Sequence, residues 1–341
     1  MSGSSNDIPG ADLAPVDLRE ARERVARVAR RTPLLPSETL SERCGHAVAL
    51  KCENLQLGGA FKIRGATNFI ARAVGAAGVP GRGRSGGAGL ITYSSGNHAI
   101  AVALGARRMG LLAVVVMPET APDVKVERVR ALGAEIHRAG TTSLERRARA
   151  EAICAERGLT MVPPFDHPWI VAGQASCGLE ILEQMPETDT ILVPVGGGGL
   201  LAGIALACAA SASRVRVIGV EPEGAAKMSA SLAAGAPVVL PDVHSIADGL
   251  LPSRPGDLTF AVTRRHVAEV VTVGDDAIRE AAALLLRSEH LLVEWSGAVG
   301  VAALLSGRTR PGGRATVVVL SGGNAEPGVL LEGERRDGTI S

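Results

Sequence analysis

The 341-residue chain has little of what marks several common classes of protein. Only 2% of its residues are aromatic, so a surface that stacks nucleic-acid bases is not expected. The 36 Lys and Arg residues are balanced by 35 Asp and Glu, and the net charge of +1 offers no basic face to a phosphate backbone. No apolar run approaches the roughly 20 residues that a membrane-spanning helix needs. We therefore expect neither nucleic acid nor a membrane as a partner.

Cysteine is also scarce and is spread along the chain. The five cysteines form no C-x-x-C pair and adjoin no histidine pattern, so we expect buried, reduced thiols and neither a zinc nor an iron-sulfur site. The residues from Met1 to Ala11 are polar and lack the basic start and apolar stretch of a secretory signal. These features predict a cytoplasmic protein.

Small and aliphatic residues dominate what is present. Hydrophobic residues make up 46% of the chain and there are 42 glycines, a composition typical of an α/β protein with many tight turns between strands and helices. Short apolar runs predict strands at Ala47–Cys52, Leu90–Tyr93, Leu112–Met117, Glu135–Arg138, Thr160–Val162, Thr190–Val195, Arg216–Glu221, Val267–Val273 and Ala315–Leu320. Helical patterns cover Pro15–Val28, Ala66–Ala77, Gly96–Met109, Pro122–Leu132, Leu144–Arg157, Gly173–Glu183, Leu200–Ser211, Asp275–Glu289 and Gly297–Leu305. The segment 78–89 is predicted to be an exposed connector, and the alternation predicts mostly parallel sheets with functional residues at the carboxyl ends of the strands.

The most specific local motif is a strand that runs into four glycines, Gly196 to Gly199, and then into a helix starting near Leu200. Glycines let the backbone approach an anion, and the helix start offers unpaired N–H groups with a favourable dipole. The motif lacks the ending of a P-loop and the spacing G-x-G-x-x-G. It indicates a phosphorylated cofactor of another kind, although a plain tight turn has the same pattern.

Three further segments carry reactive or polar groups. Lys62 stands in the small, apolar turn Gly58–Gly65, where burial would lower its pKa and free the amine for imine formation; a surface lysine is the alternative. The loop Ser94–His98 lies between a strand and a helix and could hold a carboxylate, or could simply cap the helix. Leu320–Asn324 again joins a strand to glycines, and by itself is also typical of an ordinary turn.

Together these segments resemble the fold type II family of pyridoxal-phosphate enzymes, in particular its threonine/serine dehydratase and serine racemase branch. The resemblance runs from about Val16 to Asn324 and includes Lys51–Gln56, the lysine turn, the Ser94–His98 loop, Ala172–Gln174, the four glycines, Gly219–Pro222, Ala247–Gly249 and Leu320–Asn324. It implies an α/β fold of two open, twisted, mostly parallel sheets flanked by helices, similar to the tryptophan synthase β chain. We expect a large cofactor-binding domain from residues 13–88 and 167–330, a small domain from 89–166, and flexible tails at 1–12 and 331–341.

The resemblance also implies roles for individual residues. Lys62 would be the lysine that forms a Schiff base with pyridoxal 5'-phosphate, supported by Phe61, and Gly196, Gly197, Gly198, Gly199 and Leu200 would hold the phosphate. Asn97 would hydrogen-bond the pyridine hydroxyl, with Glu294 on the same side unless it is only a carboxylate at the end of a strand. Ser94, Ser95, Asn97 and His98 would bind the substrate carboxylate.

Ser321, which the resemblance places at the pyridine nitrogen, bears on the type of reaction. A hydroxyl is far too weak an acid to keep that nitrogen protonated, so elimination or racemisation is favoured over transamination. Lys62 would take the α-proton as the general base. Loss of a β-hydroxyl then leads to a 2-oxo acid and ammonia, whereas a proton returned from the opposite face by Ser95 leads to the other enantiomer.

Some positions depart from the family pattern. Ala60 stands where the family usually has Ser or another small residue before Phe-Lys, and Trp295 follows Glu294 where the family usually has Pro. Racemase-like members bind a divalent cation, for which Glu221 and the carbonyl of Ala225 are candidate ligands here. Lys227 occupies the third, acidic position, and an ammonium cannot ligate Mg²⁺ or Ca²⁺, although it could replace the charge of the cation. We expect no metal.

The sequence thus predicts a homodimeric lyase of amino-acid metabolism that dehydrates a small β-hydroxy amino acid such as L-threonine or L-serine. The alternatives are a serine-like amino-acid racemase and a dehydratase for a specialised β-substituted amino acid. A non-catalytic nucleotide-binding or sensory protein on the same scaffold is a further alternative, and it would not need both Lys62 and Ser321.

Overall fold

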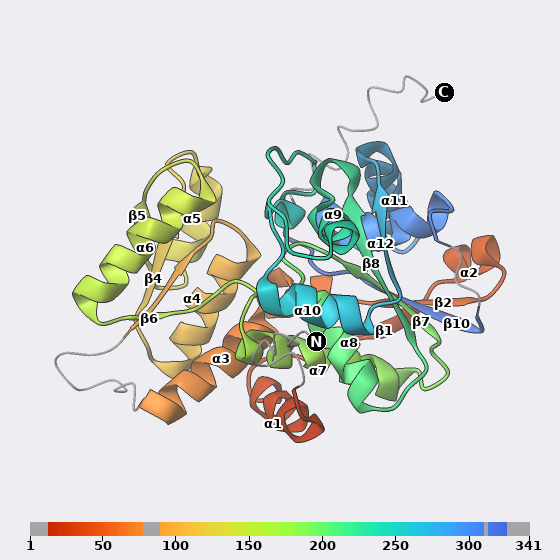
Figure 1. Cartoon of the computed structure of the whole chain (residues 1–341), viewed down its shortest axis with the longest axis horizontal. Helices are drawn as coiled ribbons and strands as arrows, with labels where there is room; N and C mark the ends of the chain where they lie inside the picture. The colour runs from red at the N-terminus through yellow and green to blue at the C-terminus, as the bar shows by residue number, and fades with distance from the viewer. Residues whose placement is uncertain (1–12, 78–88, 310–312, 326–341) are drawn as a thin grey trace, which may run out of the picture.

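The computed structural model describes residues 13–77, 89–309 and 313–325. The predicted tails at 1–12 and 331–341, and all of the predicted connector except Gly89, lie outside these residues. Figure 1 shows two sheets side by side, each flanked by helices. Along the described residues, no helix is both long and apolar enough to cross a membrane.

The larger sheet has six strands in the order β1-β2-β10-β7-β8-β9. Its strands are β1 (Leu34–Pro36), β2 (Ala47–Lys51), β7 (Thr190–Pro194), β8 (Arg216–Pro222), β9 (Glu269–Val273) and β10 (Ala315–Val319). Strand β1 pairs antiparallel with β2, and the other four pairings are parallel. The carboxyl ends of β2, β7, β8, β9 and β10 therefore lie along one edge.

The smaller sheet has four parallel strands in the order β5-β4-β3-β6. They are β3 (Leu90–Tyr93), β4 (Ala113–Met117), β5 (Glu135–Arg138) and β6 (Thr160–Met161). All four come from the middle of the chain, whereas the strands of the larger sheet precede and follow them. The predicted fold class is confirmed, and the boundaries proposed for the domains stay a prediction.

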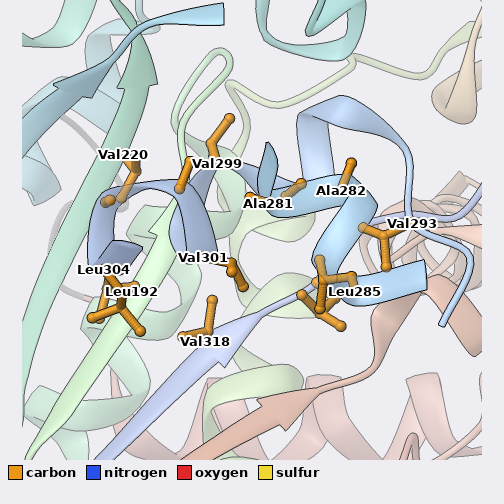
Figure 2. Packing of buried hydrophobic residues seen from close by; sticks show 14 of the residues in the cluster. Leu192, Val220, Ala281, Ala282, Leu285, Val293, Val299, Val301, Leu304 and Val318 are labelled. Atoms are coloured by element: carbon orange, nitrogen blue, oxygen red, sulfur yellow. The ribbon is translucent and has the colours of Figure 1, made fainter. Parts of the chain in front are cut away.

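Both faces of the larger sheet are covered by helices. Leu192, Val220 and Val318 point to one face and pack against α11 (Asp275–Arg287) and α12 (Trp295–Leu305), as Figure 2 shows. Ile191, Val193, Val317 and Val319 alternate with them along β7 and β10 and pack with α7 (Pro168–Gln184) and α8 (Gly199–Ala210) on the other face. This two-residue alternation with both faces apolar explains why the strands read as continuous hydrophobic runs.

The remaining helices complete the two layers. They are α1 (Pro15–Ala26), α2 (Glu38–Cys44), α3 (Lys62–Ala77), α4 (Asn97–Met109), α5 (Asp123–Arg130), α6 (Ser143–Arg157), α9 (Lys227–Ala234) and α10 (Asp257–His266), with short 3₁₀ turns η1 (Glu53–Leu55), η2 (Leu57–Gly59), η3 (Glu223–Ala225) and η4 (Asp248–Leu250). The sequence analysis missed α2, α9, α10 and β1. The signals for α2 are present, because the side chain of Ser37 accepts from Leu40 N and Gly45 ends the helix at a φ of 72°.

Helices α3 and α7 each begin earlier than predicted, at Lys62 and Pro168. Each helix carries, near its predicted start, a glycine that lowers helix propensity but is needed for packing. A Cβ atom at Gly65 would lie 2.5 Å from Gln174 Nε2, and one at Gly173 would lie 2.7 Å from the Cα of Gly65. The two backbones therefore approach closely where these glycines meet. The early start places Lys62 at the first position of α3.

A buried network of charges ties the same two helices to the larger sheet. The guanidinium of Arg64, on α3, donates to both carboxylate oxygens of Glu53 at 2.7 Å and to those of Glu180, on α7, at 2.7 and 2.8 Å. The amine of Lys51, on β2, donates to Glu180 at 2.6 Å and to the carbonyl of Thr32 at 2.9 Å. Two cations and two anions thus balance inside the protein.

Arg64→Met should destabilise the protein strongly, because it leaves two buried carboxylates facing one remaining cation. We expect a loss of about 3–5 kcal/mol in the free energy of unfolding, measured by urea denaturation. Arg147→Met is the matched control, since Arg147 pairs with Glu151 on the exposed surface of α6 and should cost less than about 1 kcal/mol. Equal losses in the two variants would contradict a structural role for the network.

Candidate active site

Lys62 combines an early helix position with a half-buried amine. Its Nζ atom donates to the carbonyl of Pro164 at 2.9 Å and lies 5.2 Å from the centre of the Phe61 ring. Burial lowers the pKa of this amine from 10.5 to about 8, and the carboxylate of Glu294 offsets part of that effect. A large fraction of the amine is therefore neutral near physiological pH and can act as a base or a nucleophile.

The four glycines lie between β7 and α8, as predicted. Gly198 precedes the helix with a φ of 94°, a left-handed conformation that favours glycine, and no side chain caps the helix start. The first N–H groups of α8 have no partner within the helix, so they are available to an anion together with the helix dipole. Leu200, the second residue of α8, is buried.

One short segment contacts both Lys62 and the glycine loop. Pro164 accepts the hydrogen bond from the lysine, and Phe165 packs so closely on the loop that Cβ atoms at Gly197 and Gly199 would lie 2.4 and 3.0 Å from its side chain. The amine and the anion-binding helix start therefore share a neighbour in space, although 134 residues separate Lys62 from Gly196. The sequence analysis did not single out this segment.

Asn97 begins α4 and lies at the centre of a chain of side-chain hydrogen bonds. Its Nδ2 donates to Glu294 Oε1 at 2.7 Å, and its Oδ1 accepts from Asn324 Nδ2 at the same distance. Asn324 also donates to the carbonyl of Gly58 at 2.8 Å and accepts from Arg128, on α5, at 2.6 Å. These hydrogen bonds connect α4 and α5, which flank the smaller sheet, to segments next to the larger sheet. Asn324 is part of the predicted motif Leu320–Asn324, but no role was predicted for it.

Glu294 is buried next to this chain, with 9% of its surface exposed. The pKa of its carboxyl group is raised to about 7, mainly by burial and also by the negative charge of Asp248, while the hydrogen bond from Asn97 acts against both. The carboxyl group can therefore gain or lose a proton near neutral pH.

Ser321 and Phe61 come together at the ends of two neighbouring segments. Phe61 N donates to the carbonyl of Ser321 at 3.1 Å, and Ala60 forms a bridge with Gly322. The Ser321 side chain is buried, and its hydroxyl lies 3.5 Å from the carbonyl of Ser296, at the outer limit of a hydrogen bond. Ser321 thus lies beside Phe61, the residue before Lys62, and the roles predicted for Phe61 and Ser321 stay predictions.

The loop Ser94–His98 brings two hydroxyl groups and an imidazole ring close to Lys62. Ser94 and Ser95 are half-buried, and the hydroxyl of Ser94 accepts from Gly96 N at 3.3 Å. The ring of His98 is buried, and its Nε2 donates to the carbonyl of Val162 at 3.2 Å. Burial and the nearby Lys62 lower the pKa of His98 to about 3, so the ring is neutral and anchors the loop.

The candidate metal ligands Glu221 and Ala225 both contact Lys227, the residue that the sequence analysis found at the third ligand position. The ammonium of Lys227 lies between the Glu221 carboxylate, at 3.2 Å, and the carbonyl of Ala225, at 3.0 Å. Within the described residues, no three or more His, Cys, Asp or Glu side chains are grouped to hold a metal ion. The oxygens of this region are already occupied by a cation of the chain itself.

The comparisons with known proteins decide the family. The family described as pyridoxal-phosphate dependent enzyme matches residues 25–323. The chain belongs to this family. An L-threonine ammonia-lyase of Geobacter sulfurreducens is 43% identical over 309 residues, which cover 91% of this chain and 75% of the relative. A serine racemase of Oryza sativa subsp. indica is 38% identical over 320 residues, 92% of each chain.

A solved structure gives the same result for the fold. Maize serine racemase has a TM-score of 0.87 and 36% identity, covering 96% of this chain and 98% of that one. The predicted family, enzyme class and cofactor, pyridoxal 5'-phosphate, are confirmed. The donor set fits this cofactor, because a half-buried amine contacts Pro164 while the next residue, Phe165, packs on the loop before an uncapped helix start that can hold a phosphate. The roles of the individual residues stay predictions.

The lowered pKa of Lys62 can be tested on the cofactor-free enzyme. Only a neutral amine adds to an aldehyde, so trapping of a simple aldehyde at Lys62 with borohydride should be half-maximal near pH 8 rather than near 10.5. Mass spectrometry of the peptide that carries residue 62 gives the rate at each pH. Lys62→Arg should show no trapping at this position, and a midpoint near the ordinary value would refute the effect of burial.

Glu294 should make stability depend on pH with a defined sign. Because its pKa is raised in the folded protein, the native state binds more protons than the unfolded state between pH 4.5 and about 7, and stability falls as pH rises through this window. Glu294→Gln removes the cost of burying the charge. Above pH 7, the free energy of unfolding of Glu294→Gln should exceed that of the wild type by up to about 3 kcal/mol. Near pH 4.5 the two values should be nearly equal.

Urea denaturation of the two cofactor-free proteins at about pH 5 and about pH 8 measures this difference. A difference that does not change between the two pH values would show that the carboxyl group does not titrate in this range.

Proposed function

We propose that this enzyme is an ammonia-lyase that converts a small β-hydroxy amino acid, with L-threonine and L-serine as first candidates, to a 2-oxo acid and ammonia. The observation that carries the proposal is the Lys62 amine, whose pKa is lowered to about 8. The amine lies close enough to the Ser94–His98 loop to lower the pKa of His98, and the N–H of the preceding residue, Phe61, donates to the carbonyl of Ser321. The relatives named L-threonine ammonia-lyase support the same reaction.

The loop before α4 is suited to hold the carboxylate of the substrate. It presents the two half-buried hydroxyls of Ser94 and Ser95 and the start of α4, where Gly96 caps the helix without a side chain. Free N–H groups and the positive end of the helix dipole favour an anion there. The neutral ring of His98, held by the carbonyl of Val162, keeps this end of the helix in place.

Lys62 then performs the proton transfer. Its neutral Nζ accepts the α-proton of the bound amino acid, a step for which a base with a pKa near the working pH is well matched. When bound, pyridoxal phosphate supplies an aldehyde for the amino group and a conjugated ring that takes up the electron pair left at the α-carbon. The backbone N–H groups of the glycine loop and of the start of α8 would hold its phosphate, which would supply the acid that lets the hydroxyl leave as water.

Two further side chains tune the outcome. The Ser321 hydroxyl can hydrogen-bond a ring nitrogen but cannot keep it protonated, which favours loss of the β-hydroxyl over transamination. Asn97 is proposed to bind the ring hydroxyl, and Glu294, which accepts from Asn97 at 2.7 Å, holds that amide in position.

Racemisation is the second candidate, and the relatives named serine racemase favour it. It needs a second acid on the face of the substrate opposite Lys62, and Ser95 is the residue proposed for this role. Both reactions begin with the same proton removed by Lys62, so one site can support both.

The test incubates the holoenzyme with L-threonine and with L-serine, and measures 2-oxo acid, ammonia and the chirality of the remaining amino acid. We expect oxo acid and ammonia in equal amounts from at least one substrate. Lys62→Ala should lower the rate by about 10³-fold or more, whereas Arg147→Met, on the remote surface of α6, should not change it. Ser95→Ala should abolish any D-isomer and leave elimination measurable.

Two outcomes would contradict the proposal. Formation of D-isomer without oxo acid would favour the racemase, and the absence of both products would exclude these substrates.

The expected homodimer and cytoplasmic location rest on the family resemblance and on the composition. Size-exclusion chromatography with light scattering tests the first of them.

A further inference from the structure

Lys227, the first residue of α9, is completely buried and surrounded by oxygen atoms. Its Nζ donates to three carbonyls, those of Val195 at 2.8 Å, Leu250 at 2.9 Å and Ala225 at 3.0 Å. The carboxylate of Glu221 lies at 3.2 Å. Val195 follows β7, Glu221 lies near the end of β8, and Ala225 and Leu250 belong to the turns η3 and η4. A single amine therefore connects four different segments.

The geometry requires the charged form of this amine. A neutral amine has two N–H donors and a lone pair, and the lone pair would face one of the three carbonyls, which can only accept. The ammonium has three donors, one for each carbonyl. The carboxylate of Glu221, at 3.2 Å and completely buried, balances the charge of the ammonium. Glu221 is itself held by the backbone N–H groups of Met228 and Ser229, each at 2.9 Å.

The ammonium also orients the glycine loop. None of the peptide bonds of the described residues is cis, and in a trans peptide the C=O and the following N–H point in opposite directions. Because the carbonyl of Val195 points to Lys227, the N–H of Gly196 points away from it. The carbonyl of Gly197 is likewise held by Thr259 Oγ1 at 2.7 Å, which directs the N–H of Gly198. Lys227 thus determines the direction of one of the donors at the anion site.

Three carbonyls and one carboxylate are the ligands that hard metal cations take in proteins. The chain uses lysine sparingly, since only four of its 36 basic residues are lysines: Lys51, Lys62, Lys125 and Lys227. A compact ammonium fits such a cage of oxygens, whereas the planar guanidinium of arginine does not. The ammonium group of Lys227 therefore has the size and the charge of a monovalent cation in this cage.

We infer that the Lys227 ammonium is a built-in cation that holds the glycine loop in its binding geometry, so that cofactor binding requires no added metal ion, and that removing this side chain leaves a cation-binding site. The inference makes Lys227 a positioning residue. It rests on the phosphate-binding role proposed for the glycine loop, and not on the identity of the substrate.

The experiment compares the wild type with Lys227→Ala and Lys227→Asp. Cofactor affinity is measured from the visible absorbance of the imine, and the thermal midpoint is measured on the cofactor-free protein, in tetramethylammonium buffers of constant ionic strength. Lys227→Ala should bind the cofactor about 10- to 100-fold more weakly, the range typical of residues that support a ligand-binding group. NH₄⁺ or K⁺ should restore the affinity and raise the thermal midpoint, because each fits the vacated position.

Lys227→Asp adds a carboxylate to the cage and should respond instead to Ca²⁺ or Mg²⁺, in both measurements. The wild type should respond to none of these ions. Lys125→Ala is the control for loss of one positive charge, because Lys125 pairs with Asp248 at an exposed position; its response to NH₄⁺ should equal that of the wild type.

Wild-type affinity in Lys227→Ala without any cation would overturn the inference, and so would a wild type that itself needs K⁺ or Mg²⁺. If both variants fail to fold and no cation recovers either of them, the cage does not accept a free ion and the inference is wrong. If the wild type binds no cofactor, the proposed function fails, while the thermal midpoints of the cofactor-free proteins still test the cage.

Discussion

The close packing of three helices through glycine is the constraint on which the rest of the structure depends. Gly65 of α3 meets Gly173 of α7, and Gly203 of α8 faces the same helix, since a Cβ atom there would lie 2.7 Å from Ala175 N. Side chains at these positions would separate the helices. Lys62 begins α3 and the glycine loop begins α8, so this packing fixes the distance between the reactive amine and the anion-binding N–H groups. The half-buried amine of Lys62 and the loop at the start of α8 thereby both contact the segment Pro164–Phe165.

The buried lysines show how the chain distinguishes structural from reactive amines. Lys51 and Lys227 each contact a carboxylate as well as backbone carbonyls, so their charge is compensated inside the protein. Lys62 donates to a neutral carbonyl, and its pKa falls to about 8. The completely buried Lys51 and Lys227 thus stabilise the fold, whereas the half-buried Lys62, whose hydrogen-bond partner is neutral, is available for chemistry.

The similarity to both ammonia-lyases and racemases follows from the chemistry of such a site. Removal of the α-proton is common to the two reactions, and their outcome depends on which group next gives up a proton. Ser321 lies next to Phe61 and is proposed to limit how far charge can be stored on the cofactor ring, whereas Ser95 lies in the loop before α4. Small differences in these side chains, on one fold, are therefore enough to separate a lyase from a racemase.

Strand-to-helix alternation and the motifs around Lys62, Gly196–Gly199 and Ser321 were sufficient to predict the fold class, the cofactor and the family, because each depends on local backbone chemistry or on a recognisable pattern. The starts of α3 and α7 could not be predicted, since the glycines that weaken them locally are stabilised only by contact with each other. The sequence also does not reveal the contacts of Pro164, Phe165 and Asn324 in the site, because they join segments that are distant in the chain. The pKa values of Lys62 and Glu294 were also decided by the tertiary structure alone, because they depend on burial and on neighbours that sequence order does not reveal.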